Sequence, residues 1–171
     1  MPLIKNERFV TDTWRHLADD EGVPDATRLT FSYARWAEQR EAFAALPAAL
    51  GVRIPNDVSP MKLAPDLARL SLIVLSFPKF TDGRAYSQAR LLRGRLGFTG
   101  ELRAEGEVLR DQLLFMRRCG FETFAVGERA LAENWLAAFR EIDVFYQPAE
   151  DSELPVWRRR LAAARRDFTV V

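Results

Sequence analysis

The sequence predicts a single α/β domain whose mainly parallel sheet has about four to six strands, built from strand–helix–strand repeats. The run Leu72–Leu75 has aliphatic side chains on both faces, which is typical of a strand covered by helices on both sides. A polar turn follows, and apolar residues then recur at helical spacing between Ala85 and Leu96. Strand and helix patterns alternate in this way from residue 70 to residue 146. The sheet is therefore either an open three-layer sheet or a partial (β/α) barrel.

Residues 1–60 form an N-terminal part with weaker patterns. Residues 3–10 alternate weakly and predict a small edge strand, after which Thr11–Trp14 has the composition of a helix start. Later turn-forming residues separate short periodic runs. These runs predict a strand over Arg28–Tyr33, a helix over Trp36–Leu50 that Pro47 kinks or shortens, and a short strand over Val52–Ile54.

Residues 70–146 form the predicted core of the domain. Pro65–Leu70 is expected to be a short helix or turn that leads into the central strand. Glycines at 97, 100, 106 and 120 mark the ends of the elements that follow. We predict helices over Ala85–Leu96, Val108–Cys119 and Glu128–Ile142, and strands over Gly100–Gly106, Phe121–Val126 and Val144–Tyr146.

A basic amphipathic helix is predicted for residues 151–168. Asp151 and Ser152 are suited to cap its start. Its apolar stripe lies opposite four arginines, and such a helix more often docks on its own domain than engages a partner or a phosphate-rich surface. The stripe consists of Trp157, Leu161, Ala164 and Phe168, and the arginines are Arg158, Arg159, Arg165 and Arg166.

Composition bounds the class of protein. The 171 residues include 25 basic and 24 acidic side chains, so the overall charge does not favour a nucleic acid or a membrane as partner. One cysteine excludes an intrachain disulfide and fits a reducing compartment, so we expect a cytoplasmic protein. The single histidine, His16, is expected on the surface of a short helix, and it makes a Ser-His-Asp triad or a multi-histidine metal site improbable.

The polar turn after the central strand is the predicted site. Cations and free N–H groups at the start of a helix favour a small anion, and the ends of parallel strands are where such folds place ligands. We expect Arg103 or Glu105 of the next strand to lie near this turn. The alternative is that Asp82 caps the helix while the arginines form surface pairs. The candidate ligand-binding residues are Lys79, Asp82, Gly83, Arg84, Ser87 and Arg103.

The residues of the polar turn and its surroundings could serve either catalysis or binding. Asp82 and Asp111 are the candidate acid–base groups, but no nucleophile, metal-ligand set, flavin or nucleotide motif accompanies them. Binding or a structural ion-pair network is therefore favoured over catalysis, and no cofactor is assigned. Cys119 is a candidate redox residue, although a packed structural cysteine at a helix end is the favoured interpretation.

The chain resembles a known bacterial family. The specific signature is the run from Lys79 to Ser87 together with the arginine-rich run from Met116 to Phe121. The resemblance extends more loosely from Asp12–Trp14 to about Tyr146. The segments that carry it are Phe77–Ser87, Leu91–Arg93, Gly100–Ala104, Leu109–Gln112 and Met116–Phe121, and they closely resemble the DUF934 family.

The resemblance implies a limited set of functions. Members of the family are usually described as probable oxidoreductases or as accessory proteins of sulfite reduction. We therefore expect an accessory protein of assimilatory sulfate and sulfite reduction. Its expected partner is a small oxyanion, sulfite reductase itself or another enzyme of sulfate assimilation. The alternatives are an oxidoreductase-type enzyme that acts on an anionic substrate at Lys79, Asp82, Arg84 and Arg103, and an oligomeric scaffold with no small-molecule site.

Overall fold

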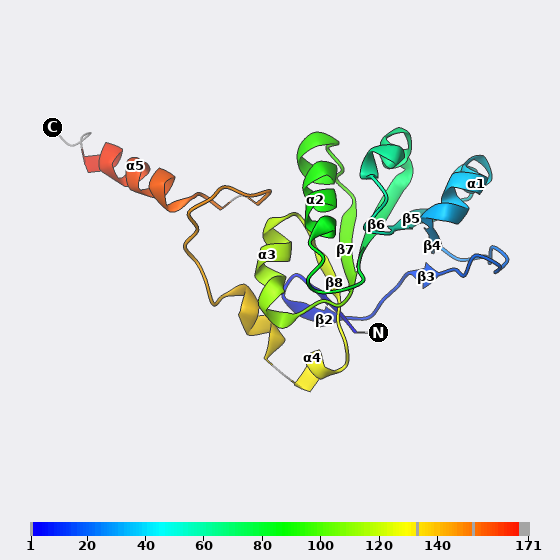
Figure 1. The fold of residues 1–171 in the computed structure, drawn as a ribbon, viewed down its shortest axis with the longest axis horizontal. Helices are drawn as coiled ribbons and strands as arrows, with labels where there is room; N and C mark the ends of the chain where they lie inside the picture. The colour runs from blue at the N-terminus through cyan, green and yellow to red at the C-terminus, as the bar shows by residue number, and fades with distance from the viewer. Residues whose placement is uncertain (1, 133, 152, 168–171) are drawn as a thin grey trace.

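The computed structural model describes residues 2–132, 134–151 and 153–167 (Figure 1). Eight strands form one mixed sheet in the order β2-β1-β8-β7-β6-β5-β4-β3. The strands are β1 (Leu3–Lys5), β2 (Arg8–Val10), β3 (Arg15–His16), β4 (Arg28–Ser32), β5 (Ala49–Ile54), β6 (Leu70–Phe77), β7 (Glu101–Gly106) and β8 (Thr123–Ala125).

The sheet is a curled half-barrel. Strands β3 to β8 are parallel and lie side by side in chain order. Because each crossover between neighbouring parallel strands has the same hand, the connecting helices follow one another along the outer face (Figure 1). The helical segments are α1 (Tyr33–Ala44), η1 (Pro60–Arg69), α2 (Arg84–Arg90), η2 (Leu91–Arg95), η3 (Arg110–Gln112), α3 (Leu113–Arg118), α4 (Arg129–Ala132), η4 (Trp135–Phe139) and α5 (Val156–Asp167).

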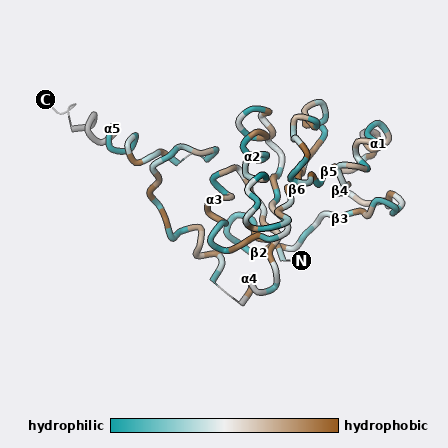
Figure 2. Tube along the Cα trace, viewed as in Figure 1, coloured by the Kyte–Doolittle hydropathy of each residue, from teal (hydrophilic) through white to brown (hydrophobic). Residues whose placement is uncertain are grey.

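The main core lies between the outer face of the sheet and these helices. Leu75 and Phe77 of β6 are fully buried there, and Figure 2 shows hydrophobic stretches along this strand. Phe31 of β4 stacks on Phe43 of α1 with ring centroids 3.9 Å apart. This packing confirms that β6 is an inner strand of the sheet.

The N-terminal segment fills the inner, concave face. Residues 11–14, which we call the crossing segment, run from β2 across the sheet to β3 (Figure 1). Trp14 is 9% exposed and packs against Leu72 and Val74, the inward-facing aliphatic side chains of β6. The chain thus supplies its own cover for the half-barrel.

Several predictions at the N-terminus are wrong. Residues 3–10 form two strands joined by a tight turn, and β1 pairs antiparallel with both β2 and β8, so the sheet is mixed and larger than predicted. Thr11–Trp14 is not helical, and His16 lies on β3 instead of a helix. Helix α1 ends at Ala44, since residues 49–54 pair with β4 and β6.

The regular elements between residues 128 and 146 are also shorter than predicted, or absent from the described chain. In place of a helix over Glu128–Ile142 the structure has the short segments α4 and η4, and Val144–Tyr146 is not a strand. A C-terminal helix, α5, is present, but it begins at Val156 and not near Asp151, and Ser152 and Phe168 lie outside the described residues. It lies apart from the sheet instead of docking on the domain as expected (Figure 1). No helix of the described chain is long and apolar enough to cross a membrane.

Candidate functional site

The loops that follow β5, β6 and β7 meet at one end of the sheet, which we call the C-terminal edge (residues 55–59, 78–83 and 107–112). Side chains tie these loops together. Gln88 of α2 is buried, and its Nε2 donates to the carbonyl oxygens of Pro55 at 2.8 Å and Val58 at 2.7 Å. The N–H of Glu107 donates to the carbonyl oxygen of Phe77 at 2.8 Å. The C-terminal edge is therefore held in one geometry by contacts between its loops.

Asp82 is the central acceptor of the polar turn. The Nη2 of Arg84 donates to its Oδ2 at 2.7 Å, the Nδ2 of Asn56 donates to the same oxygen at 2.8 Å, and the backbone N–H of Arg84 reaches Oδ1 at 3.2 Å. The hydrogen bonds from Arg84 hold the pKa of Asp82 well below its usual range, and the pKa of Arg84 is raised in turn. The carboxylate is thus ionised at neutral pH and neutralises the arginine beside it.

The other predicted residues of the turn are open to solvent. Lys79, Gly83 and Ser87 are exposed. Within the described chain, the side chains of Lys79 and Ser87 take part in no hydrogen bond or ion pair. The structure therefore places one unpaired cation, Lys79, near the internally neutralised pair of Asp82 and Arg84.

Phe80 stands out among the exposed residues of the C-terminal edge. Its side chain is 48% exposed. Its backbone is nevertheless fixed on both sides, because its N–H donates to the carboxylate of Glu107 at 2.9 Å and its carbonyl oxygen accepts from the Nε2 of Gln112 at 3.3 Å. The turn thus presents an aromatic ring on a fixed backbone, a feature that sequence reasoning missed because both anchors come from the next loop.

Arg103 does not join the polar turn. It lies in the middle of β7 with its side chain 3% exposed on the inner face, where Nη1 donates to Asp12 at 2.8 Å and Nη2 to Glu101 at 3.0 Å. Its hydrogen bonds and ion pairs within the described chain include none to Lys79 or Asp82. The strand parity explains this placement, since Arg103 points away from the outer face on which α2 packs.

A chain of polar contacts crosses the inner face through Arg103, and we call it the inner-face network. Lys5 donates to Glu101 at 2.6 Å at one end, and His16 lies 2.9 Å from Asp12 and 2.6 Å from the hydroxyl of Thr30 at the other. Its members are Lys5, Glu101, Arg103, Asp12, His16 and Thr30. The network thus joins four strands, β1, β7, β3 and β4, to the crossing segment.

Charge pairing within this network keeps its carboxylates ionised. Burial would raise the pKa of Asp12, but hydrogen bonds from His16 and the Trp14 N–H and the charge of Arg103 lower it. Burial acts against ionised Glu101 in the same way, and Lys5, Thr123 and Arg103 lower its pKa. Both carboxylates are therefore held in their ionised form by the groups around them.

Glu105 was expected near the turn and lies instead at the end of β7 on the inner face. Its Oε1 accepts from the Nη2 of Arg53 at 2.9 Å and from the hydroxyl of Ser76 at 3.2 Å. The Arg53 side chain remains 41% exposed. This group links three neighbouring strands at the C-terminal edge without including Lys79 or Arg84.

Asp111 and Cys119 lie apart from these groups. Asp111 is exposed in η3. Cys119 is a free thiol, 4% exposed at the end of α3, and burial raises its pKa. A buried, protonated thiol is a poor nucleophile. The described residues contain no group of three or more His, Cys, Asp or Glu side chains placed to hold a metal ion.

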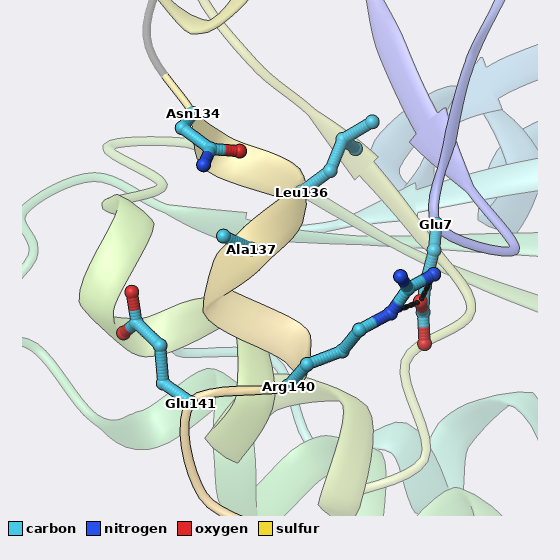
Figure 3. Close-up of a pocket in the computed structure, with 6 residues that line it drawn as sticks. All are labelled: Glu7, Asn134, Leu136, Ala137, Arg140 and Glu141. Atoms are coloured by element: carbon cyan, nitrogen blue, oxygen red, sulfur yellow. Dashed lines mark hydrogen bonds and ion pairs between the residues drawn. The ribbon is translucent and has the colours of Figure 1, made fainter.

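A hollow of about 490 Å³ lies between η4 and the turn that joins β1 to β2 (Figure 3). Glu7 lies in this turn with a left-handed backbone, φ 56°, and accepts from Arg140 at 2.7 Å and Arg117 at 2.9 Å. The hydrogen bond from Arg140 is the main cause of the lowered pKa of Glu7. None of the predicted site residues lines this hollow, which is formed by Glu7, Asn134, Leu136, Ala137, Arg140 and Glu141.

The family model described as "Bacterial protein of unknown function (DUF934)" matches residues 51–157, which is more than half of the chain. The chain is a member of the DUF934 family. No curated protein matches it. The matched range of this DUF934 protein contains the whole C-terminal edge and strands β6 to β8.

Two arginines in the segments that carry the resemblance, Arg93 in Leu91–Arg93 and Arg118 in Met116–Phe121, have structural roles in this DUF934 protein. Arg93 donates to the carbonyl oxygens of Phe98 at 2.6 Å and Gly100 at 2.8 Å, so it fixes the loop before β7. Arg118 binds Asp151 at 2.8 Å and lies over the ring of Phe145 at 3.8 Å. These arginines tie loops to the sheet, whereas Lys79 and Phe80 of the same motif set point outward.

Proposed function

We propose that this DUF934 protein is an accessory protein of assimilatory sulfate and sulfite reduction, and that it acts by binding sulfite reductase through its C-terminal edge. The assignment to this process rests on what the family resemblance implies. The choice of protein contact over anion binding rests on a single observation. Phe80 is an exposed aromatic side chain on a backbone that Glu107 and Gln112 hold from both sides.

A fixed, exposed aromatic ring is suited to protein recognition. Interfaces draw most of their binding energy from a few aromatic and arginine anchors. A loop that is already ordered loses little conformational entropy on binding, so more of the contact energy appears as affinity. Phe80 meets both conditions, and Lys79 beside it supplies a cation that no other side chain neutralises within the described chain.

The charges around the turn favour this mode over an oxyanion site. Arg84 is held by the carboxylate of Asp82, which would also repel an incoming anion at the start of α2. Arg103 is buried between two carboxylates. Of the three predicted cations, Arg84 and Arg103 are therefore neutralised by carboxylates, and Lys79 is the one without an ion pair among the described residues.

Binding of the purified protein to purified sulfite reductase tests the proposal, with the affinity measured by biolayer interferometry. Phe80→Ala should weaken binding by about tenfold or more, as expected for an anchor residue. Tyr146→Ala is the matched control, since Tyr146 is 77% exposed and lies outside the C-terminal edge. Equal affinities for wild type and Phe80→Ala, or no binding by wild type, would refute the proposal.

A small oxyanion is the second candidate, and it is favoured by Lys79 in the turn and Ser87 in the first turn of α2, two exposed side chains with no hydrogen-bond or ion-pair partner among the described residues. A ligand that binds the folded state raises the unfolding temperature by mass action. Sulfite or sulfate should then raise the midpoint of wild type, and Lys79→Ala should abolish the shift. An enzyme that uses Asp82 as its acid is less well supported, because Arg84 keeps that carboxylate ionised.

A further inference from the structure

Helix α5 lies apart from the sheet (Figure 1). Two apolar side chains of its predicted stripe, Trp157 and Leu161, are exposed. Trp157 is 42% exposed and Leu161 is 58% exposed, and their spacing of four residues places them on one face of the helix. The chain before α5 is attached to the domain through Arg118 of α3, whose side chain binds Asp151 at 2.8 Å and whose carbonyl oxygen accepts from the N–H of Glu150 at 3.0 Å. The stripe therefore faces solvent on a helix with a fixed base.

Positive charge flanks this stripe. Residues 156–167 contain five arginines and one aspartate. At 100° per residue, Arg158 and Arg160 fall on the two sides of the line through Trp157 and Leu161. Such a face fits an apolar groove with an acidic rim.

The same chain has a groove of this kind at the other end of the sheet. A hollow of about 300 Å³ lies between the residues before β4 and the residues before β5. Asp25 lines it, and Val23 in its wall is 40% exposed. Its apolar lining includes Val23, Pro24, Ala26, Leu46, Pro47 and Ala48.

One carboxylate, Asp25, lines this groove, and three more precede it in the sequence. Residues 19–27 contain four carboxylates and no basic side chain. Glu21 is paired with Arg15 at 2.5 Å and Asp19 accepts from Ser32 at 2.6 Å. Asp20 and Asp25 have no hydrogen-bond or ion-pair partner within the described chain. Asp25 therefore leaves at the groove a negative charge that no ion pair within the described chain neutralises, and this charge is opposite in sign to that of the α5 arginines.

We propose that α5 of one copy docks into the groove of a second copy, with Trp157 against the apolar residues that line the groove and arginines of α5 near Asp25. The two surfaces do not meet within one chain, because α5 and the β3–β4 end lie at opposite ends of the molecule (Figure 1). The groove and all but the first two residues of α5 lie outside the matched range 51–157, so the contact belongs to this chain and not to the family pattern.

The contact has a defined symmetry. Each contact joins the helix of one copy to the groove of another. The two copies therefore use different surfaces in that contact, which is a heterologous, head-to-tail arrangement. Association should rise with protein concentration and fall with added salt, since exposed charges are screened. Docking should also shift tryptophan emission to the blue, because Trp14, Trp36 and Trp135 are at most 9% exposed and Trp157 is the exposed one.

Sedimentation velocity of the full chain, from about 1 to about 100 µM, tests the proposal. Wild type should associate with increasing concentration, and Trp157→Ala and Asp25→Arg should each weaken association by about tenfold or more. Glu38→Arg is the matched charge control, because Glu38 is exposed on α1 outside the groove. Its association should equal that of wild type.

Mixing the two defective variants gives the decisive result. Trp157→Ala keeps an intact groove and Asp25→Arg keeps an intact helix, so an equimolar mixture should form a heterodimer that neither variant forms alone. A monomeric wild type at all concentrations, a Trp157→Ala variant that associates normally, or a mixture that stays monomeric would overturn the proposal. Binding of wild type to anionic phospholipid vesicles without self-association would also overturn it.

Discussion

Replacing Arg103 by methionine should destabilise the fold through the inner-face network. The substitution keeps an apolar stem but leaves the carboxylates of Asp12 and Glu101 without their shared cation. Removal of one partner from a buried ion pair costs about 3–5 kcal/mol of the free energy of unfolding. Because Lys5 and His16 still contact these carboxylates, we expect the lower end, about 3 kcal/mol.

Urea unfolding followed by circular dichroism measures this loss. Lys79→Met is the control, because Lys79 is exposed and unpaired within the described chain, and its effect should stay within about 0.5 kcal/mol. If Arg103→Met were no less stable than this control, the inner-face network would not contribute to stability as argued.

The stabilities of wild type and Arg103→Met should depend differently on pH. The pKa values of Asp12 and Glu101 lie below their ordinary values of 3.8 and 4.5 in the folded state. The unfolded chain therefore takes up protons first as the pH falls through about 4.5, so the free energy of unfolding decreases below that pH. Arg103→Met removes one cause of the lowered pKa values, and its stability should depend less steeply on pH between about 5 and 3.

Three further changes probe other parts of the account. Trp14→Ala should lower the free energy of unfolding in urea by about 3 kcal/mol or more, because it empties the space over Leu72; a loss below about 1 kcal/mol would contradict this packing. Gly106→Ala should cost about 1–3 kcal/mol, because φ is +96° and a Cβ would collide with the carbonyl oxygen of Phe77; wild-type stability would count against that geometry. Cys119 should react slowly with a thiol reagent in the native protein and rapidly in urea, and fast native reaction would show that the thiol is accessible.

The core of the fold could be predicted because its signals are local. Aliphatic residues of both parities from Leu72 to Leu75 require cover on both faces, and the structure supplies helices on one and Trp14 on the other. Glycines at 97 and 106 end η2 and β7 with positive φ, as the pattern indicated. The predicted α/β class and the mostly parallel sheet follow from these features.

The conformation of the crossing segment could not be predicted, because the hydrogen bond that Asp12 accepts within it occurs both at helix starts and in isolated turns. Asp12 accepts from the Trp14 N–H at 3.0 Å, which is the bond expected of a residue that starts a helix or an isolated turn. The extended conformation is stabilised by the other oxygen of Asp12, which accepts from Arg103, 91 residues further along the chain. Likewise, residues 45–50 favour a helix locally, but Leu50 pairs between Leu29 and Leu70 in the sheet.

For the candidate site, the sequence predicted the proximity of Asp82 and Arg84 correctly, but the expected proximity of Arg103 or Glu105 to them was wrong. Asp82 and Arg84 are close in sequence and in space. Strand parity alone would have placed Arg103 and Glu105 on the face opposite Leu102 and therefore away from α2. Nothing local marks Phe80 as fixed, because its anchors lie in the loop after β7.

Hydrogen–deuterium exchange of the full chain, with and without sulfite reductase, tests the central claim most directly. Binding through the C-terminal edge should protect backbone amides of residues 78–83 and 107–112, and leave α1 unchanged. The Phe80→Ala variant should lose this protection. Unchanged exchange throughout the C-terminal edge in the presence of saturating sulfite reductase would contradict the account.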